Sequence, residues 1–225
     1  MRINKLLAVT TGFSRRAADR VIAEGRVLIN SKRPENGQDV TIEDKLELDG
    51  GLLDTTKAFG NKEYRTVIFN KPRGYVVSRN GQGSKTIYDL LPKDLHDLKP
   101  VGRLDKDSSG LLLLTDDGQL ANRLTHPRYE KIKRYEVELD HSLVPLHRQM
   151  IEDYGVTLED GPSRLQLERL HDGNDKAWRV TMREGRNRQI RRTFAALGYT
   201  VTKLHRTNFG DYMLGDLKPG STKIL

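Results

Sequence analysis

The sequence has no cysteine, few aromatic residues and no long apolar run. Phe, Trp and Tyr together make up only 6% of its 225 residues. Without cysteine the chain has neither disulfides nor thiol chemistry. No apolar run approaches the roughly 20 residues that a membrane span requires, and residues 1–16 lack the continuous apolar stretch of a secretion signal. We therefore expect a cytoplasmic protein without membrane contact.

Negative charge is scarce in one short segment. The chain has 39 Lys and Arg against 31 Asp and Glu, a formal net charge of +8. Residues 1–33 hold eight cationic and two acidic side chains, whereas residues 34–50 hold one and six. Clustered Lys and Arg gain affinity for phosphates by releasing counterions, so this pattern favours a polyanionic partner. The hydrophobic content of 36% is typical of a folded globular protein.

The N-terminal residues predict a helical hairpin. Ile3, Leu6 and Leu7 recur at helical spacing. Ser14 is placed to cap a second helix that ends at Gly25, because a serine hydroxyl can accept a hydrogen bond from the first helical turn. We therefore expect two short helices before the first strand.

The second predicted helix carries a cluster of arginines. Arg16 and Arg20 are four residues apart and share a helix face, while Arg15 and Arg26 lie at its two ends. The spacing alone is also compatible with an ordinary solvated basic face. A phosphate-binding face and a solvated one both remain open at this point.

The chain is expected to contain two units joined by a linker. A small module over residues 1–50 ends with short strands, and residues 51–63 show no sustained periodicity, which is typical of a linker. In residues 64–225, short apolar runs alternate with fewer helical stretches, the clearest near 119–124 and 188–197. The predicted fold class is α+β, with a helical-hairpin-plus-strands module followed by a mixed, mainly antiparallel sheet flanked by helices.

The most informative stretch, VGRLDKDSSGLLLLTDDG, begins at Val101. Its four leucines, residues 111–114, form a run short enough for a buried strand between two turn signals. Asp105 therefore lies on a loop that enters the core, where a carboxylate needs a partner and a cation would keep it ionised. A structural turn aspartate explains the pattern equally well. Asp116 and Asp117 are typical of turn and helix-capping residues.

A second unusual stretch, residues 183–206, has seven Lys and Arg against one Glu. Ile190, Phe194 and Leu197 recur at positions i, i+4 and i+7, so they predict a helix with one face in the core. Gly198 is a natural stop for that helix.

The first turn of this helix holds cations where they are unfavourable. Arg188, Arg191 and Arg192 lie at the positive end of the helix dipole, so an anionic partner is expected, either a phosphate or a buried carboxylate. A solvated basic face fits Arg186 and Arg192 better than Arg191, because Arg191 is adjacent to the apolar stripe.

Other site types have little support. Six histidines without cysteine show no zinc-ligand spacing, so no metal is expected. The Ser108-Ser109-Gly110 segment lacks the flanking glycine of a nucleophile elbow. The GDLKPGSTK segment lacks a lysine after its second glycine, so it is not a phosphate-binding loop.

The chain resembles the RsuA/RluB/RluE/RluF branch of the pseudouridine synthases over nearly its whole length. GRLDKDSSGLLLLTDDG is similar to the family's central motif, whose catalytic aspartate falls on Asp105. NKPRGYVVS, at 70–78, resembles the preceding motif, and KRYEVEL, at 133–139, resembles the motif that supplies an active-site tyrosine, here Tyr135. EGRNRQIRRTFAALG, at 184–198, completes the set.

This resemblance implies a chemistry and roles for individual residues. By the family pattern Arg191 pairs with the catalytic aspartate, Ile190 helps line the base pocket, and Tyr135 stacks against the base and assists proton removal. The reaction detaches uracil, rotates it and rejoins it through carbon five without a cofactor. The aspartate acts either on the anomeric carbon or as a proton acceptor that yields a glycal, and the sequence leaves both routes open.

The resemblance also implies an RNA partner. The N-terminal residues are similar to a small RNA-binding module of a ribosomal protein, so Arg15, Arg16 and Arg20 would contact phosphates. Arg103 would fill the gap left by a uridine turned out of its stack. We expect ribosomal RNA or an assembling ribosomal particle as substrate, the large subunit being slightly favoured, and a monomeric enzyme. The alternative is a ribosome-assembly factor that binds ribosomal RNA without catalysis.

Overall fold

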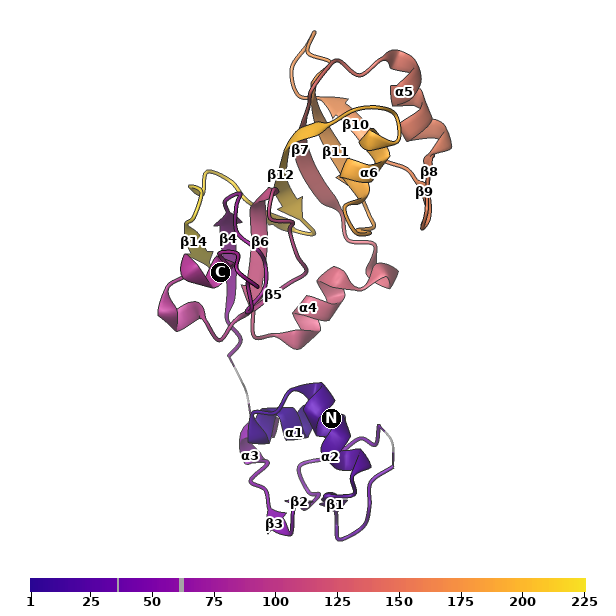
Figure 1. The fold of residues 1–225 in the computed structure, drawn as a ribbon. Helices are drawn as coiled ribbons and strands as arrows, with labels where there is room; N and C mark the ends of the chain where they lie inside the picture. The colour runs from indigo at the N-terminus through magenta and orange to yellow at the C-terminus, as the bar shows by residue number, and fades with distance from the viewer. Residues whose placement is uncertain (36, 61–62) are drawn as a thin grey trace. The chain divides into compact units, whose positions relative to one another are not determined.

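The computed structural model describes residues 1–35, 37–60 and 63–225, and it divides into two compact units, Met1–Glu63 and Tyr64–Leu225 (Figure 1). The first unit contains helices α1 (Ile3–Thr11), α2 (Arg15–Ala23) and α3 (Thr56–Phe59), and strands β1 (Val27–Ile29), β2 (Leu46–Leu48) and β3 (Gly51–Leu52). The strands form an antiparallel sheet in the order β1-β2-β3.

The helical hairpin of the first unit follows the predicted pattern. Ile3, Leu6 and Leu7 are buried and pack with residues of α2 and the sheet. The Ser14 hydroxyl accepts a hydrogen bond from Ala17 N at 3.1 Å, which confirms the predicted cap of α2. The amphipathic pattern of α2 thus buries one face and leaves the arginines on the other.

The linker predicted at residues 51–63 is not supported over its first part. Strand β3 extends the small sheet, and Leu53, Ala58 and Phe59 pack against the core of the first unit. These apolar side chains are too few to produce a helical or strand periodicity in the sequence. The segment nevertheless folds back on α1 and partly buries them there. Residues 61 and 62 lie outside the described ranges.

The second unit is built on one large sheet and a separate two-stranded hairpin, β8–β9. The strands of the unit are β4 (Thr66–Lys71), β5 (Lys99–Pro100), β6 (Ser109–Thr115), β7 (Lys133–Leu139), β8 (Val156–Leu158), β9 (Gly161–Ser163), β10 (Gln166–Arg169), β11 (Ala177–Met182), β12 (Val201–Phe209), β13 (Tyr212–Met213) and β14 (Thr222–Ile224). Its helices are α4 (Gly118–Thr125), α5 (Pro145–Gln149) and α6 (Gln189–Ala195), with single-turn segments at Ile87–Asp89, Lys93–Leu95, Pro127–Tyr129 and Met150–Tyr154.

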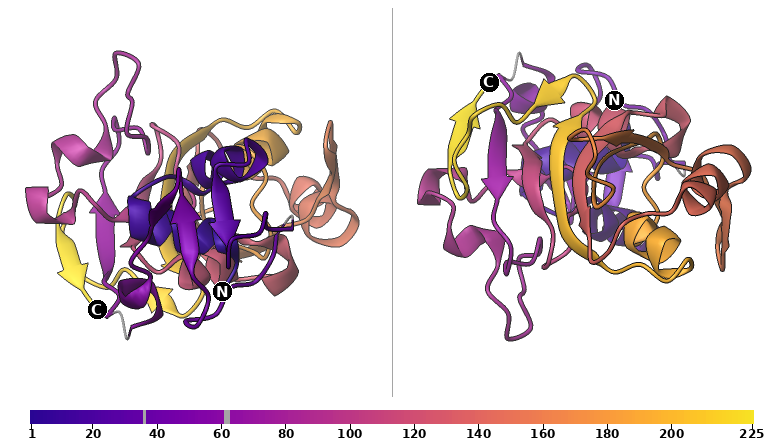
Figure 2. Two further views of the ribbon diagram at one scale, coloured as in Figure 1. Left: turned by 90° about the horizontal axis from the view of Figure 1, so that it is seen from below. Right: turned by 90° about the horizontal axis from the view of Figure 1, so that it is seen from above.

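The sheet is mixed and mainly antiparallel. Its strand order is β10-β11-β7-β12-β6-β4-β14, and within this path β12 and β6 run parallel while the other neighbours are antiparallel. Strand β14, yellow in Figure 2, pairs with β4, so the last strand lies beside the strand that opens the unit. The predicted α+β class is confirmed. None of the helices in the described ranges is long and apolar enough to cross a membrane.

The central strand β6 explains the run of four leucines. Leu112 and Leu114 pack in the larger core cluster, whereas Leu111 and Leu113 pack in a second cluster. Successive side chains of a strand point to opposite faces, so a strand covered on both faces needs apolar residues at every position. The loop that holds Asp105 enters this strand, and it is therefore attached to the most buried part of the unit.

Candidate active site

A pocket of about 420 Å³ lies in the second unit. Strands β7 and β12 contribute Tyr135, Leu204 and Arg206 to it, and the loops at 102–105 and 183–188 contribute further lining residues. The predicted residues Arg103, Asp105, Tyr135 and Ile190 all line this pocket, although they come from segments far apart in the sequence.

A buried lysine holds the loop of Asp105 in place. Lys71, at the end of β4, is fully buried, and its ammonium donates hydrogen bonds to the carbonyl oxygens of Pro72 (3.1 Å), Asp105 (3.0 Å) and Ser108 (2.8 Å). Burial lowers the pKa of Lys71 to about 8, although the charges of Asp105 and Asp107 oppose this shift. Sequence reasoning missed Lys71. The available signal was a cation at the end of an apolar strand.

Arg188 forms an ion pair with Asp105. Its Nη1 atom lies 3.5 Å from Asp105 Oδ2 and 3.3 Å from Asp107 Oδ1. Arg188 precedes the first residue of α6 and adopts a left-handed backbone conformation with φ of 46°. This conformation ends the 183–188 loop and turns the chain into the helix. The side chain of Asp105 stays 32% exposed, so the carboxylate remains accessible from the pocket.

The predicted pairing of Arg191 with Asp105 is corrected by the structure. Arg191 Nη2 lies 3.3 Å from Asp107 Oδ2 and donates to the Asp107 carbonyl at 3.2 Å, while Nη1 donates to Val201 O at 2.7 Å. Arg191 lies nearly one turn further along α6 than Arg188, so its guanidinium reaches the back of the loop and the start of β12. It joins the loop to the sheet, and the charge of Asp105 opposes the lowering of its pKa by burial.

Charge and burial oppose each other around Arg191. Burial lowers the pKa of Arg191, and the charge of Asp107 counteracts this effect. Burial alone would raise the pKa of Asp107, but its hydrogen bond with Arg188 and the charge of Arg191 outweigh burial, so that pKa lies below its usual value. The anionic partner expected for the first turn of α6 is therefore a carboxylate, and for Arg188 and Arg191 it is that of Asp107.

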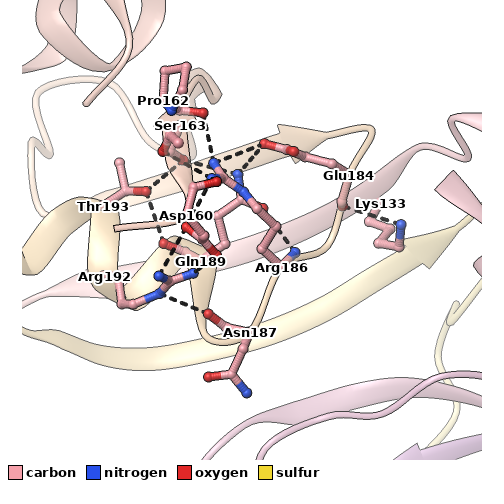
Figure 3. Close-up of polar contacts among 11 residues, drawn as sticks. Lys133, Asp160, Pro162, Ser163, Glu184, Arg186, Asn187, Gln189, Arg192 and Thr193 are labelled. Atoms are coloured by element: carbon pink, nitrogen blue, oxygen red, sulfur yellow. Dashed lines mark hydrogen bonds and ion pairs between the residues drawn. The ribbon is translucent and has the colours of Figure 1, made fainter. Parts of the chain in front are cut away.

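A polar network fixes the other side of the 183–188 loop (Figure 3). Arg186 Nη1 lies 2.9 Å from Asp160 Oδ1, and Arg192 forms two hydrogen bonds with the same carboxylate, at 3.1 and 2.7 Å. Arg186 also donates to the carbonyls of Gly161 and Pro162. The hydrogen bond from Arg192 lowers the pKa of Asp160. A solvated basic face, which fitted these two arginines better than Arg191, therefore does not describe them, because both pair with Asp160.

The network connects this loop to the β8–β9 hairpin. Gln189 and Thr193, both buried in α6, form hydrogen bonds with the Ser163 hydroxyl at 3.0 and 2.8 Å. Because β8 and β9 are short and lie outside the main sheet, their sequence gives little sign of this role. The hairpin supports the pocket wall that is formed by residues 183–188.

The pocket combines an apolar slot with a carboxylate. Tyr135 and Ile190 are only 8% and 4% exposed and line it together with Leu204. Apolar and aromatic surfaces of this kind can hold a flat heterocyclic ring. Arg103 is an exposed lining residue. The arrangement can therefore hold a ring beside the accessible carboxylate of Asp105.

The arginines of α2 form an exposed cationic face in the first unit. Arg15, Arg16 and Arg20 are exposed, and Arg15 Nη2 donates to Asn4 Oδ1 at 2.9 Å. Asn4 in turn donates to Asp19 at 2.7 Å. Asn4, on α1, therefore bonds to two residues of α2, which holds the α1–α2 hairpin together and gives the cationic face a defined shape.

Comparison with known proteins gives one consistent result. The model of the family described as RNA pseudouridylate synthase matches residues 65–196. A Yersinia pestis protein named ribosomal large subunit pseudouridine synthase B is 38% identical, over 95% of this chain and 68% of its own length. A Bacillus subtilis protein of the same name is 35% identical, over 100% of this chain and 91% of its own length.

A solved structure is also similar over the whole chain. It is described as a pseudouridylate synthase and matches with a TM-score of 0.69 and 33% identity, over 100% of this chain and 96% of that one. Some relatives named ribosomal large subunit pseudouridine synthase B are considerably longer, and the chain spans 40% of one of them.

Proposed function

Because this chain belongs to the RNA pseudouridylate synthase family, we propose that it converts a specific uridine of ribosomal RNA to pseudouridine. The relatives named for the ribosomal large subunit favour large-subunit RNA as the substrate. The observation that carries the proposal is the pocket in which Asp105 is accessible beside Tyr135 and Ile190.

In this proposal Asp105 is the catalytic carboxylate. It acts either by attacking the anomeric carbon or by accepting a proton from the sugar, and both routes release uracil from its nitrogen-linked bond. Arg188 places a positive charge 3.5 Å from Oδ2 of this carboxylate, and Lys71 and Arg191 hold the loop on which it lies. No cofactor is required, because the bond broken and the bond formed join the same sugar and base.

The apolar slot retains the detached base. Uracil stacks on Tyr135 and against Ile190 while it rotates, and trapping it there keeps the two fragments at a high effective concentration. Tyr135 then assists removal of the proton from carbon five. Arg103, exposed beside the pocket, fills the gap that the flipped uridine leaves in the RNA.

The first unit contributes affinity for RNA. Arg15, Arg16 and Arg20 present positive charge on one exposed helix, and such a surface binds phosphates without reading sequence. We propose that this unit binds ribosomal RNA or an assembling particle and that the enzyme acts as a monomer in the cytoplasm.

The decisive experiment is a map of pseudouridine in ribosomal RNA. Reverse-transcription stops after carbodiimide treatment are compared between cells with and without the protein. We expect one stop to disappear, to return with the wild-type protein and with Asp172→Asn, an exposed control, and not with Asp105→Asn. An Asp105→Asn variant that binds RNA normally and restores the stop would refute the catalytic role. An unchanged map would favour a binding factor that assists ribosome assembly.

A further inference from the structure

One arginine of the pocket is buried and has no carboxylate partner in the part of the chain that the structure describes. Arg206, on β12, is only 2% exposed, and its Nε atom donates to Leu111 O at 2.7 Å. Its Nη2 atom is buried without a hydrogen-bond partner among the described residues. Arg186 and Arg188 line the same pocket, and both have carboxylate partners. Burying a cation in this way is costly unless an anion from outside completes the site.

A second cation lies beside it. Lys133, on β7, is also in the pocket lining, and the hydrogen bonds of its ammonium within the described ranges go to carbonyl oxygens, those of Lys131 at 3.4 Å and Glu184 at 3.3 Å. The Lys133 ammonium lies 5.3 Å and the Arg206 guanidinium carbon 4.8 Å from the centre of the Phe209 ring. Both cations therefore lie close to the same aromatic ring.

Their charges act against each other. Burial lowers the pKa of Lys133, and the positive charge of Arg206 lowers it further, while Glu184 opposes both effects. An anion between the two side chains would remove this repulsion and occupy donors that the protein leaves weakly bonded.

The position of Arg206 relates the site to the substrate. Arg206 and Tyr135 are directly opposed in the antiparallel pairing of β12 with β7, so their side chains lie on one face of the sheet, about 5 Å apart at their Cβ atoms. Taking the proposed function as the premise, we infer that Arg206 and Lys133 bind one phosphodiester group of the RNA next to the flipped uridine. The pair offers only donors and two positive charges. This chemistry matches a phosphate, whereas the uracil edge also needs an acceptor for its N3–H group.

The test measures coupling between these residues and single phosphates. RNA hairpins are taken from the site found by mapping, or otherwise from the ribosomal fragment that binds most tightly. Each carries one neutral methylphosphonate, and its binding is followed by fluorescence anisotropy. All proteins carry Asp105→Asn, so the result does not depend on turnover and remains informative if the proposed isomerisation fails.

We expect one methylphosphonate position to weaken binding on the order of tenfold, and Arg206→Gln to weaken binding of unmodified RNA by about 10- to 100-fold. In the Arg206→Gln protein, the methylphosphonate at that position should no longer weaken binding. Lys203→Gln removes the same charge from a half-buried residue of β12 that pairs with Glu138, and in this control the methylphosphonate at that position should still weaken binding. Lys133→Gln provides a second test should Arg206→Gln fail to fold. Sensitivity that persists in Arg206→Gln and Lys133→Gln, or no sensitive position at all, would overturn the inference.

Discussion

Gly110 is the position where one added methyl group should damage both stability and catalysis. It lies in β6 just after the proposed catalytic loop, with φ of +104°, a conformation that L side chains rarely adopt. A Cβ atom there would lie 2.6 Å from Arg206 N, 2.9 Å from Arg206 C and closer still to Arg206 O. These are backbone atoms of the neighbouring strand, so they cannot rotate away. Gly110→Ala must therefore separate β6 from β12.

The cost follows from two contributions. Strained backbone conformation costs about 1–3 kcal/mol and overpacking about 1–3 kcal/mol, so we expect Gly110→Ala to lower the free energy of unfolding by about 4 kcal/mol. Relieving the contact moves the strands by up to about 1 Å, and a misplacement of that size lowers activity about 100-fold. Asp105 and Arg206 would move relative to each other.

Urea unfolding and single-turnover formation of pseudouridine measure the two effects. Gly118→Ala is the matched control, because its Cβ would meet nothing within 4 Å at the exposed start of α4. It should be neutral or stabilise the protein by up to about 1 kcal/mol. A Gly110→Ala protein that unfolds within about 0.5 kcal/mol of wild type would refute this reasoning.

Three further predictions concern other parts of the molecule. The pKa of Lys71 falls from 10.5 to about 8 on folding, so the unfolded chain binds more protons than the folded one between these pH values. The free energy of unfolding should therefore rise by about 3 kcal/mol as the pH increases through that window. An equal pH dependence of the free energy of unfolding in wild type and Lys71→Met would contradict this. Asp160→Ala removes the carboxylate that joins Arg186 of the pocket wall to Arg192 of α6, so turnover should fall, whereas Glu159→Gln should remain active; equal single-turnover rates in Asp160→Ala and wild type would exclude this support. Charge reversal at Arg16 and Arg20 should weaken RNA binding. It should reduce the slope of log affinity against log salt concentration by about one unit per lost phosphate contact, with little effect on the rate of isomerisation at saturating RNA. Unchanged affinity across salt concentrations would argue against the proposed role.

The sequence by itself predicted the features that depend on local spacing. The leucine run of β6 and the cap at Ser14 were correct, and so was the place of Asp105 on a loop at the start of β6, because each depends on residues a few positions apart. The resemblance to the pseudouridine synthases, based on ungapped motifs, is also confirmed by the matching family model. The roles of Asp105 and Tyr135 in catalysis stay predictions.

Only the tertiary structure decided which groups meet. Lys71 and Asp105 are 34 residues apart, and Arg191 contacts Asp107 across 84 residues, so no local pattern could assign these partners. The family pattern indicated the correct pair of segments but the wrong carboxylate, because one helical turn separates Arg188 from Arg191. The unsatisfied Nη2 atom of Arg206 is likewise a property of packing, since its lack of a hydrogen-bond partner among the described residues follows from the strands that surround it. Residue type and local spacing therefore predicted the elements and the loop, while strand register and burial determined the electrostatics of the site.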